Sequence, residues 1–79
     1  MNYKKSNTYN MIRINFVGHY TDYTSDDIDD IDLFARSLEM FLNNKDGDVF
    51  TISDRLGNKT MINKENICSV EFTANSDVS

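Results

Sequence analysis

The chain has 79 residues, of which 39% are hydrophobic, and 13 acidic against 8 basic side chains give a formal charge of −5. This length indicates one small domain with a thin core, and the negative charge argues against direct binding of nucleic acid. A single cysteine, Cys68, excludes an intramolecular disulfide, and no segment approaches the roughly 20 apolar residues of a membrane span. We therefore expect a cytoplasmic protein that does not interact with membranes.

The predicted organisation is a single domain between two short tails. Residues 1–9 are mostly polar and residues 74–79 are small or polar, so we expect both segments to be flexible. The intervening residues 10–73 carry periodic apolar patterns and are expected to form one α+β domain. No internal repeat of useful length divides them.

The first periodic segment predicts a β-strand. Between Met11 and Val17, residues alternate with a period of two, which is typical of a strand with one buried face. The residues expected on that face are Ile12, Ile14 and Phe16. Gly18 ends the strand, and the polar residues 19–25 are expected to form a loop that contains two tyrosines.

The next segment predicts an amphipathic helix. Its apolar residues recur at steps of three and four, and they are Ile28, Ile31, Phe34, Ala35, Leu38, Phe41 and Leu42. Thr24 or Ser25 is the expected N-cap, and Asp27 has capping-box spacing to Thr24. The residues expected to end the helix are Asn43, Asn44 and Gly47.

Three short strands are predicted in the C-terminal half. They cover residues 49–53, 59–63 and 67–72, with a turn between each pair. Short turns make these three strands an antiparallel meander. The order β-α-β-β-β then predicts an α+β two-layer sandwich, in which one amphipathic helix packs on a mainly antiparallel sheet. Two positions stay open for the first strand: parallel to the second strand, or beside the last one.

The predicted sheet has one face that the helix does not cover. In one of two possible registers, the residues on this face are Met11, Arg13, Val17, Val49, Thr51 and Ile67. A partly apolar open face is a place for a partner or a second copy. It supports an alternative function, a small homodimeric protein that is structural or sequesters a ligand.

The acidic residues are concentrated in one segment. Residues 20–34 contain six acids and no base, whereas residues 1–19 carry a charge of +3 and residues 35–79 a charge of −2. One or two acids favour a helix start through the helix dipole, each by about 0.3–1 kcal/mol. Further aspartates repel one another and have poor helix propensity. Their number indicates an anionic recognition surface, and the alternative is a solvated helix start.

The predicted recognition surface combines carboxylates with two tyrosines. Helix neighbours three and four positions apart lie about 5–6 Å from each other, so carboxylates at this spacing can enter a groove that Lys and Arg line for phosphates. Tyrosines are amphipathic and are enriched at protein interfaces. The expected partner-binding residues are Tyr20, Asp22, Tyr23, Asp26, Asp27, Asp29 and Asp30.

Catalytic and metal-binding patterns are weak in this sequence. His19 is the only histidine, and Cys68 is expected on a sheet face, where cysteine is more often buried than nucleophilic. One cysteine and one histidine cannot make a zinc site, and three separated glycines make no phosphate-binding loop. An EF-hand aligned on Gly47 places Leu42 and Ser53 at ligand positions one and twelve, where neither supplies the required carboxylate. We predict a non-catalytic protein without metal or cofactor.

In size, acidity and simple α+β build without a catalytic set, the chain resembles the small phage-encoded inhibitors of bacterial defence. Anti-CRISPR proteins are the best-known group of this class, and the resemblance covers general features along the whole chain. It implies an acidic nucleic-acid mimic that occupies a Cas-type nuclease in the host cytoplasm where target DNA would bind. The contact residues under this resemblance are Asp22, Asp26, Asp27, Asp29 and Asp30.

Overall fold

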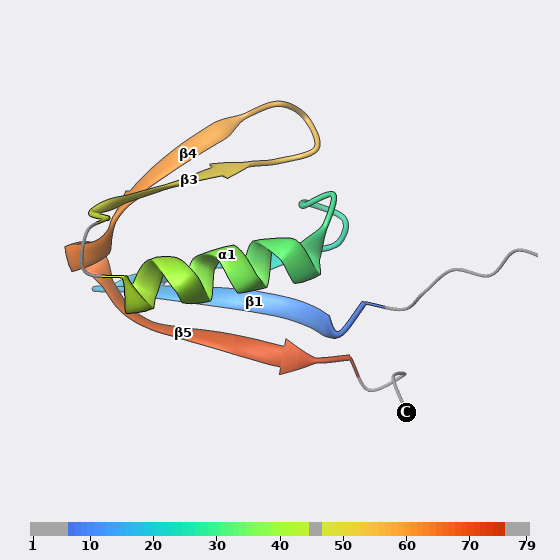
Figure 1. Ribbon diagram of the computed structural model, residues 1–79, viewed down its shortest axis with the longest axis horizontal. Helices are drawn as coiled ribbons and strands as arrows, with labels where there is room; N and C mark the ends of the chain where they lie inside the picture. Colours follow the sequence, from blue (N-terminus) through green and yellow to red (C-terminus); the bar gives the residue numbers. More distant parts are fainter. Residues whose placement is uncertain (1–6, 45–46, 76–79) are drawn as a thin grey trace, which may run out of the picture.

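The computed structural model describes residues 7–44 and 47–75, which form five strands and one α-helix (Figure 1). The strands are β1 (Tyr9–Phe16), β2 (His19–Thr24), β3 (Val49–Ser53), β4 (Lys59–Asn63) and β5 (Ile67–Ala74). The helix is α1 (Ile31–Asn43), and a short 3₁₀ turn, η1 (Lys64–Asn66), precedes β5. The expected α+β class, with one helix packed against antiparallel strands, is confirmed. No helix in the described ranges is both long enough and apolar enough to cross a bilayer.

Strand structure reaches slightly beyond the predicted domain boundaries. β1 begins at Tyr9 and β5 ends at Ala74, one residue outside the predicted range at each end. Most of the two predicted tails, namely residues 1–6 and 76–79, lies outside the described residues. The Asp32 carboxylate accepts hydrogen bonds from the Thr8 and Tyr9 N–H groups, at 2.9–3.1 Å. The start of β1 is therefore attached to the start of α1.

The loop expected at residues 19–25 is wrong, because most of that segment is strand β2. β2 pairs antiparallel with β1, from Phe16 opposite His19 to Met11 opposite Thr24. The two-residue turn between them needs Gly18, whose φ of +85° is accessible to glycine without steric cost. The polar composition of this segment is typical of a loop, although its threonine and tyrosine residues favour strands that have one exposed face. The element order is therefore β-β-α-β-β-β.

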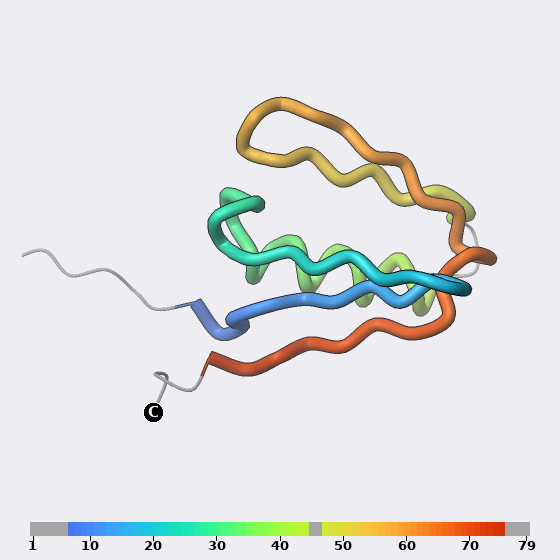
Figure 2. The backbone as a smooth tube through the Cα atoms, turned by 180° about the vertical axis from the view of Figure 1, so that it is seen from behind, coloured from blue at the N-terminus to red at the C-terminus, as the bar shows by residue number. Residues whose placement is uncertain are grey.

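The strands form two separate sheets instead of one. The first has the order β2-β1-β5, and the second is the β3-β4 hairpin. β5 pairs antiparallel with β1, so the predicted three-strand meander is wrong and the alternative position of the first strand beside the last is confirmed. This pairing sets Phe72 opposite Ile12 and Val70 opposite Ile14, which extends the apolar face under α1. Figure 2 shows β2, β1 and β5 side by side in front of the helix.

Helix α1 begins at Ile31, later than the expected N-cap at Thr24 or Ser25. Its N-cap is Asp30, whose Oδ1 accepts a hydrogen bond from the Leu33 N–H at 3.1 Å. The capping-box spacing closes a turn instead, because the Asp27 carboxylate accepts from the Thr24 N–H at 3.0 Å. A turn and a helix start use the same local hydrogen bond, so the spacing does not distinguish them. The helix ends at Asn43 with Asn44 as C-cap, close to the expected position.

The core lies between α1 and the inner face of the β2-β1-β5 sheet, and it continues under the hairpin. Its largest fully buried side chains are Ile12, Ile14, Ile31 and Leu38. The hairpin adds Ile52 and Ile62, which are also buried. Phe34 on α1 joins the two parts, because its ring contacts Tyr23 at 5.4 Å and Phe50 at 5.9 Å between centroids. The buried face of the first strand is confirmed, and so is the helix stripe from Ile31 onward, whereas Ile28 is buried but precedes the helix.

The uncovered face of the β2-β1-β5 sheet is more polar than the partly apolar face that the sequence predicts. Met11 and Arg13 lie there as expected, since they alternate with the buried Ile12 and Ile14. Beside them, the Asn15 amide donates hydrogen bonds to the Ser69 hydroxyl and the Glu71 carboxylate. The other expected residues lie elsewhere, because Val17 is in a turn, Val49 and Thr51 belong to the second sheet, and Ile67 packs against the core. A homodimer through this face has little apolar surface to bury.

Candidate functional site

The turn between β2 and α1 meets the loop between β3 and β4 at one end of the molecule (Figure 1). Arg55 in that loop joins the two segments. Its backbone N–H donates to the Asp27 carbonyl, its Nε donates to the Ser25 carbonyl, and its Nη1 lies 3.0 Å from Asp29 Oδ1. We call the carboxylates gathered here the acidic end, which comprises Asp26, Asp27, Asp29, Asp30 and Asp54.

The acidic end keeps most of its negative charge. Five carboxylates against the one guanidinium of Arg55 leave a formal charge of −4. Asp54 is half-buried, and the other four aspartates are exposed. The Asp29 side chain is 91% exposed, so water screens its ion pair with Arg55, and such pairs add little to stability. The surface is therefore anionic despite its one base.

Three carboxylates of the acidic end also hold local structure. Asp27 closes the turn after β2, Asp30 caps α1, and Asp54 accepts from the Leu56 and Asn58 N–H groups at 2.9 Å each. Hydrogen bonds to Asp54, first the one from the Asn58 backbone, lower its pKa below the usual range of aspartic acid. A carboxylate has about four acceptor positions. Asp27 and Asp30 can therefore support their turns and still accept from a partner's Lys or Arg, whereas the Asp54 carboxylate is already engaged by the Leu56 N–H and by the N–H and side-chain amide of Asn58.

Tyr20 and Asp22 lie on the uncovered face of the sheet, apart from the acidic end. Arg13 donates to Asp22 through Nε at 2.7 Å and Nη2 at 3.0 Å, and its guanidinium lies 4.0 Å from the centre of the Tyr20 ring. These two hydrogen bonds hold the pKa of Asp22 below its usual range. Arg13 balances the Asp22 charge, so the expected role of Asp22 as part of the anionic patch is not supported by its position.

Tyr23 lies on the opposite face of β2, where it packs edge-on against Phe34. Burial raises the pKa of its hydroxyl, and the nearby carboxylates of Asp27 and Asp54 add to the rise. Tyr23 thus borders the acidic end from the inside instead of standing beside it as a surface anchor. The structure brings together Asp26, Asp27, Asp29 and Asp30 with Tyr23 packed behind them, and it places Tyr20 and Asp22 on the other face of β2.

Asp54 and Arg55 belong to the acidic end but were not among the predicted site residues. In the sequence, both fall in a short turn between two strands, more than twenty residues after the predicted patch. Asp54 could be recognised there only as a turn residue. Their place next to Asp27 and Asp29 depends on how the hairpin packs against the helix, and no local pattern signals it.

Cys68 is exposed, which contradicts the expected buried position. The β1-β5 register shifts at this point, because Asn15 lies opposite Ser69 while Phe16 lies opposite Ile67. Cys68 is the extra residue of this bulge, so Ile67 takes the core side in its place. Within the described segments, no three His, Cys, Asp or Glu side chains are grouped so that they could hold a metal ion.

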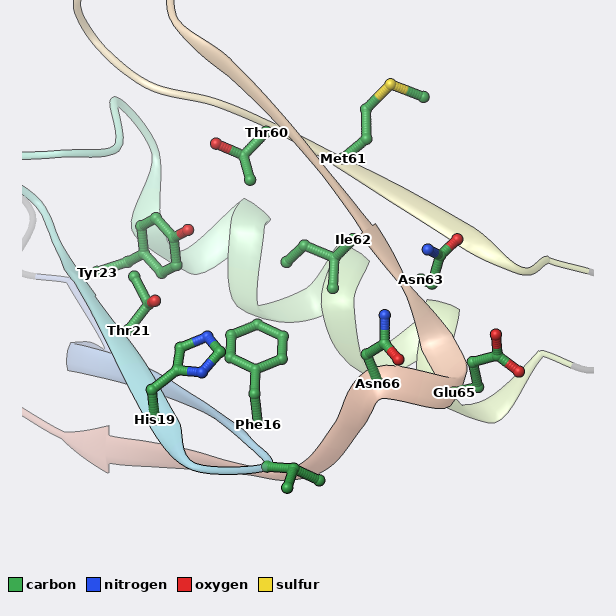
Figure 3. A pocket seen from close by; sticks show the side chains of 11 residues that line it. Phe16, His19, Thr21, Tyr23, Thr60, Met61, Ile62, Asn63, Glu65 and Asn66 are labelled. Atoms are coloured by element: carbon green, nitrogen blue, oxygen red, sulfur yellow. The ribbon is translucent and has the colours of Figure 1, made fainter.

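A groove of about 450 Å³ lies between β2 and β4 (Figure 3). The residues that line it include Phe16, His19, Tyr23, Thr60, Ile62 and Glu65. The rings of His19 and Phe16 stack at 4.8 Å between centroids. Figure 3 shows Tyr23 and Glu65 at opposite ends of the groove. The end at Tyr23 is the one that lies near Asp27 and Asp54. The groove therefore runs up to the acidic end.

Asp22→Asn is expected to make the stability of the protein less sensitive to acid. The pKa of Asp22 in the folded protein lies below the value of about 3.9 found in unfolded chains. Its stabilising contribution is therefore present above that value and is lost as the pH falls through the folded pKa. Asparagine does not ionise, so the unfolding free energy of the variant should fall less steeply between about pH 5 and pH 2.

Urea denaturation at a series of pH values measures this difference. Glu39→Gln, on an exposed position of α1, is the control that removes one charge without removing the pair with Arg13. Equal acid dependence of Asp22→Asn and Glu39→Gln would contradict the prediction.

No protein-family model, curated protein or solved structure matches this chain. The two features that remain as guides to function are the acidic end and the adjoining groove. Both are defined by contacts, charge and burial among the described residues.

Proposed function

We propose that the protein is a non-catalytic binding protein whose acidic end docks on a basic surface of a partner protein. The observation that carries this proposal is the convergence of five carboxylates on two segments that Arg55 joins. Joined segments hold the charges in place, so less ordering is needed on binding. A partner that presents Lys and Arg would gain long-range steering as well as direct contacts.

A nucleic-acid-binding groove is the kind of basic surface that fits this charge arrangement best. Such grooves use Lys and Arg to neutralise phosphates that follow one another along a backbone. The acidic end offers several single negative charges within two short segments. In the form that the anti-CRISPR resemblance favours, the partner is a Cas-type nuclease of the host cytoplasm, and binding inhibits it by excluding target DNA.

Removing three exposed charges from the acidic end is expected to weaken this binding by about tenfold or more while the fold is kept. The variant carries Asp26→Asn, Asp29→Asn and Asp30→Asn. Asparagine caps a helix about as well as aspartate, so the start of α1 is retained. Biolayer interferometry with a purified Cas-type nuclease measures the affinity, which should also fall as salt rises. Circular dichroism checks the fold.

A matched control removes three exposed charges elsewhere, through Glu39→Gln, Asp48→Asn and Glu71→Gln. This variant has the same net charge as the first and should bind like the wild type. Displacement of target DNA from the nuclease, followed by gel shift, tests the inhibitory step. Salt-insensitive binding that survives the substitutions in the acidic end would overturn the proposal.

A further inference from the structure

We propose that the groove between β2 and β4 binds an extended segment of the partner protein, in which basic residues flank a stretch of alternating apolar residues. This inference rests on the proposed function and names the part of the partner that the same surface recognises. The segment would pair with a strand edge, place apolar side chains on the groove floor, and direct its basic flanks toward carboxylates at the two ends.

Both walls of the groove are strand edges. β2 is the outer strand of the β2-β1-β5 sheet, and β4 pairs only with β3 among the described strands. An edge strand directs every second N–H and C=O away from its neighbour. An extended peptide is the ligand that offers complementary groups at the same repeat, as in strand addition. The groove therefore selects an extended backbone.

Two backbone hydrogen bonds show which amides of β4 face the groove. The Asp54 N–H donates to the Asn58 carbonyl, and the Lys64 N–H donates to the Asp48 carbonyl. Hydrogen-bonded and non-hydrogen-bonded pairs alternate along an antiparallel ladder, so the pair of Thr51 and Met61 between them is non-hydrogen-bonded. Met61 therefore directs its N–H to the groove edge of β4, and Thr51 directs its N–H to the opposite edge of the hairpin.

The side chains along the groove complement a segment with an apolar centre and basic flanks. Phe16, Tyr23 and Ile62 form an apolar floor, and all three are at least half-buried (Figure 3). The Glu65 carboxylate lies at one end. The Tyr23 end of the groove adjoins the acidic end, because the N–H of the next residue, Thr24, donates to the Asp27 carboxylate at 3.0 Å. Negative charge at both ends favours Lys or Arg on both sides of the apolar residues.

The probe for this inference is the synthetic peptide Lys-Lys-Thr-Val-Thr-Val-Thr-Lys-Lys. Two control peptides replace either the four lysines by glutamates or the two valines by prolines, which prevents strand pairing. Amide shifts in ¹H–¹⁵N spectra of the protein should change along β2 and β4 with the lysine peptide. Hydrogen exchange at the Met61 amide should slow in the same complex, because that N–H gains an acceptor. Both control peptides should bind more weakly.

Met61→Pro removes the amide that faces the groove and leaves the ladder with β3 intact. It is expected to lower the peptide affinity by about tenfold, the effect of one well-placed hydrogen bond. Thr51→Pro is the matched control, since it removes the outward amide of the same residue pair at the opposite edge. This control should bind like the wild type. Should Met61→Pro not fold, the exchange rate of the wild-type Met61 amide still decides the question.

The outcomes separate this inference from the proposed function. Slowed exchange at Met61, together with loss of binding in Met61→Pro alone, would support the groove. Shifts confined to the acidic end, with equal binding by both proline variants, would overturn the groove and leave the proposed function standing. If Met61→Pro loses peptide binding and the three asparagine substitutions have no effect, the groove proposal would be supported and the proposed role of the acidic end would be overturned. Protection of Met61 that depends on protein concentration without peptide would assign the groove to a second copy and overturn the inference.

Discussion

Leu38→Ala is expected to lower the free energy of unfolding by about 2–5 kcal/mol. Leu38 is fully buried at the centre of α1, where the helix contacts the β2-β1-β5 sheet. Truncation removes apolar contacts and leaves a cavity that a close-packed core fills only in part. Small domains are stable by only about 5–15 kcal/mol. A loss of this size is therefore a large fraction of the total stability of such a domain.

Leu56→Ala is the matched control for this prediction. Leu56 is 86% exposed in the loop between β3 and β4, and the same atoms are removed. Its effect is expected to stay within about 0.5 kcal/mol. Urea denaturation followed by circular dichroism compares the two variants under the same conditions. Equal effects would show that α1 does not supply the core.

Phe50→Ala is expected to loosen the β3-β4 hairpin while the three-stranded sheet stays folded. A two-stranded hairpin is marginally stable by itself. Phe50 attaches it to α1 through ring contacts with Phe41 at 5.2 Å and Phe34 at 5.9 Å between centroids. Because Phe50 is not fully buried, we expect a loss of about 2–3 kcal/mol, at or below the lower end of the range of about 3–5 kcal/mol for buried Phe→Ala substitutions. This loss should lower the free energy needed to open the hairpin locally.

Native-state hydrogen exchange measures this opening strand by strand. Protection of the Ile62 amide in β4 should fall by about thirtyfold or more, the equivalent of roughly 2 kcal/mol. Protection of the Ile14 amide in β1 should change little. Val49→Ala is the control, because Val49 precedes Phe50 in β3 and lies on the exposed face. A uniform fall in protection across both sheets would contradict the prediction.

The hairpin also links stability to the two proposed binding surfaces. It supplies one wall of the groove, and its loop contributes Asp54 and Arg55 to the acidic end. Opening of the hairpin would remove the wall and separate the two acidic segments. We therefore expect Phe50→Ala to weaken binding of the lysine peptide, although Phe50 itself does not belong to the acidic end.

The sequence determined the elements whose signal is local. The period-two pattern around Ile12 and Ile14 identified the buried face of β1, and the steps of three and four identified the buried stripe of α1. The strands β3 and β4 have the predicted bounds, since a turn signal at residues 54–58 separates two short strand patterns. In each case, neighbouring residues share one face of one element, so composition and spacing are enough.

Tertiary structure decided everything that depends on distant contacts. The polar sequence of β2 predicts a loop, and the segment is a strand because it pairs with β1. Strand β5 pairs with β1 rather than β4 because this places Val70 and Phe72 on the core face of the sheet. The aspartates were visible as a charge run, but Arg55 and the packing of the hairpin decide which carboxylates share a surface. Spacing along the chain carries no information about such contacts, because they depend on how the helix packs against the two sheets.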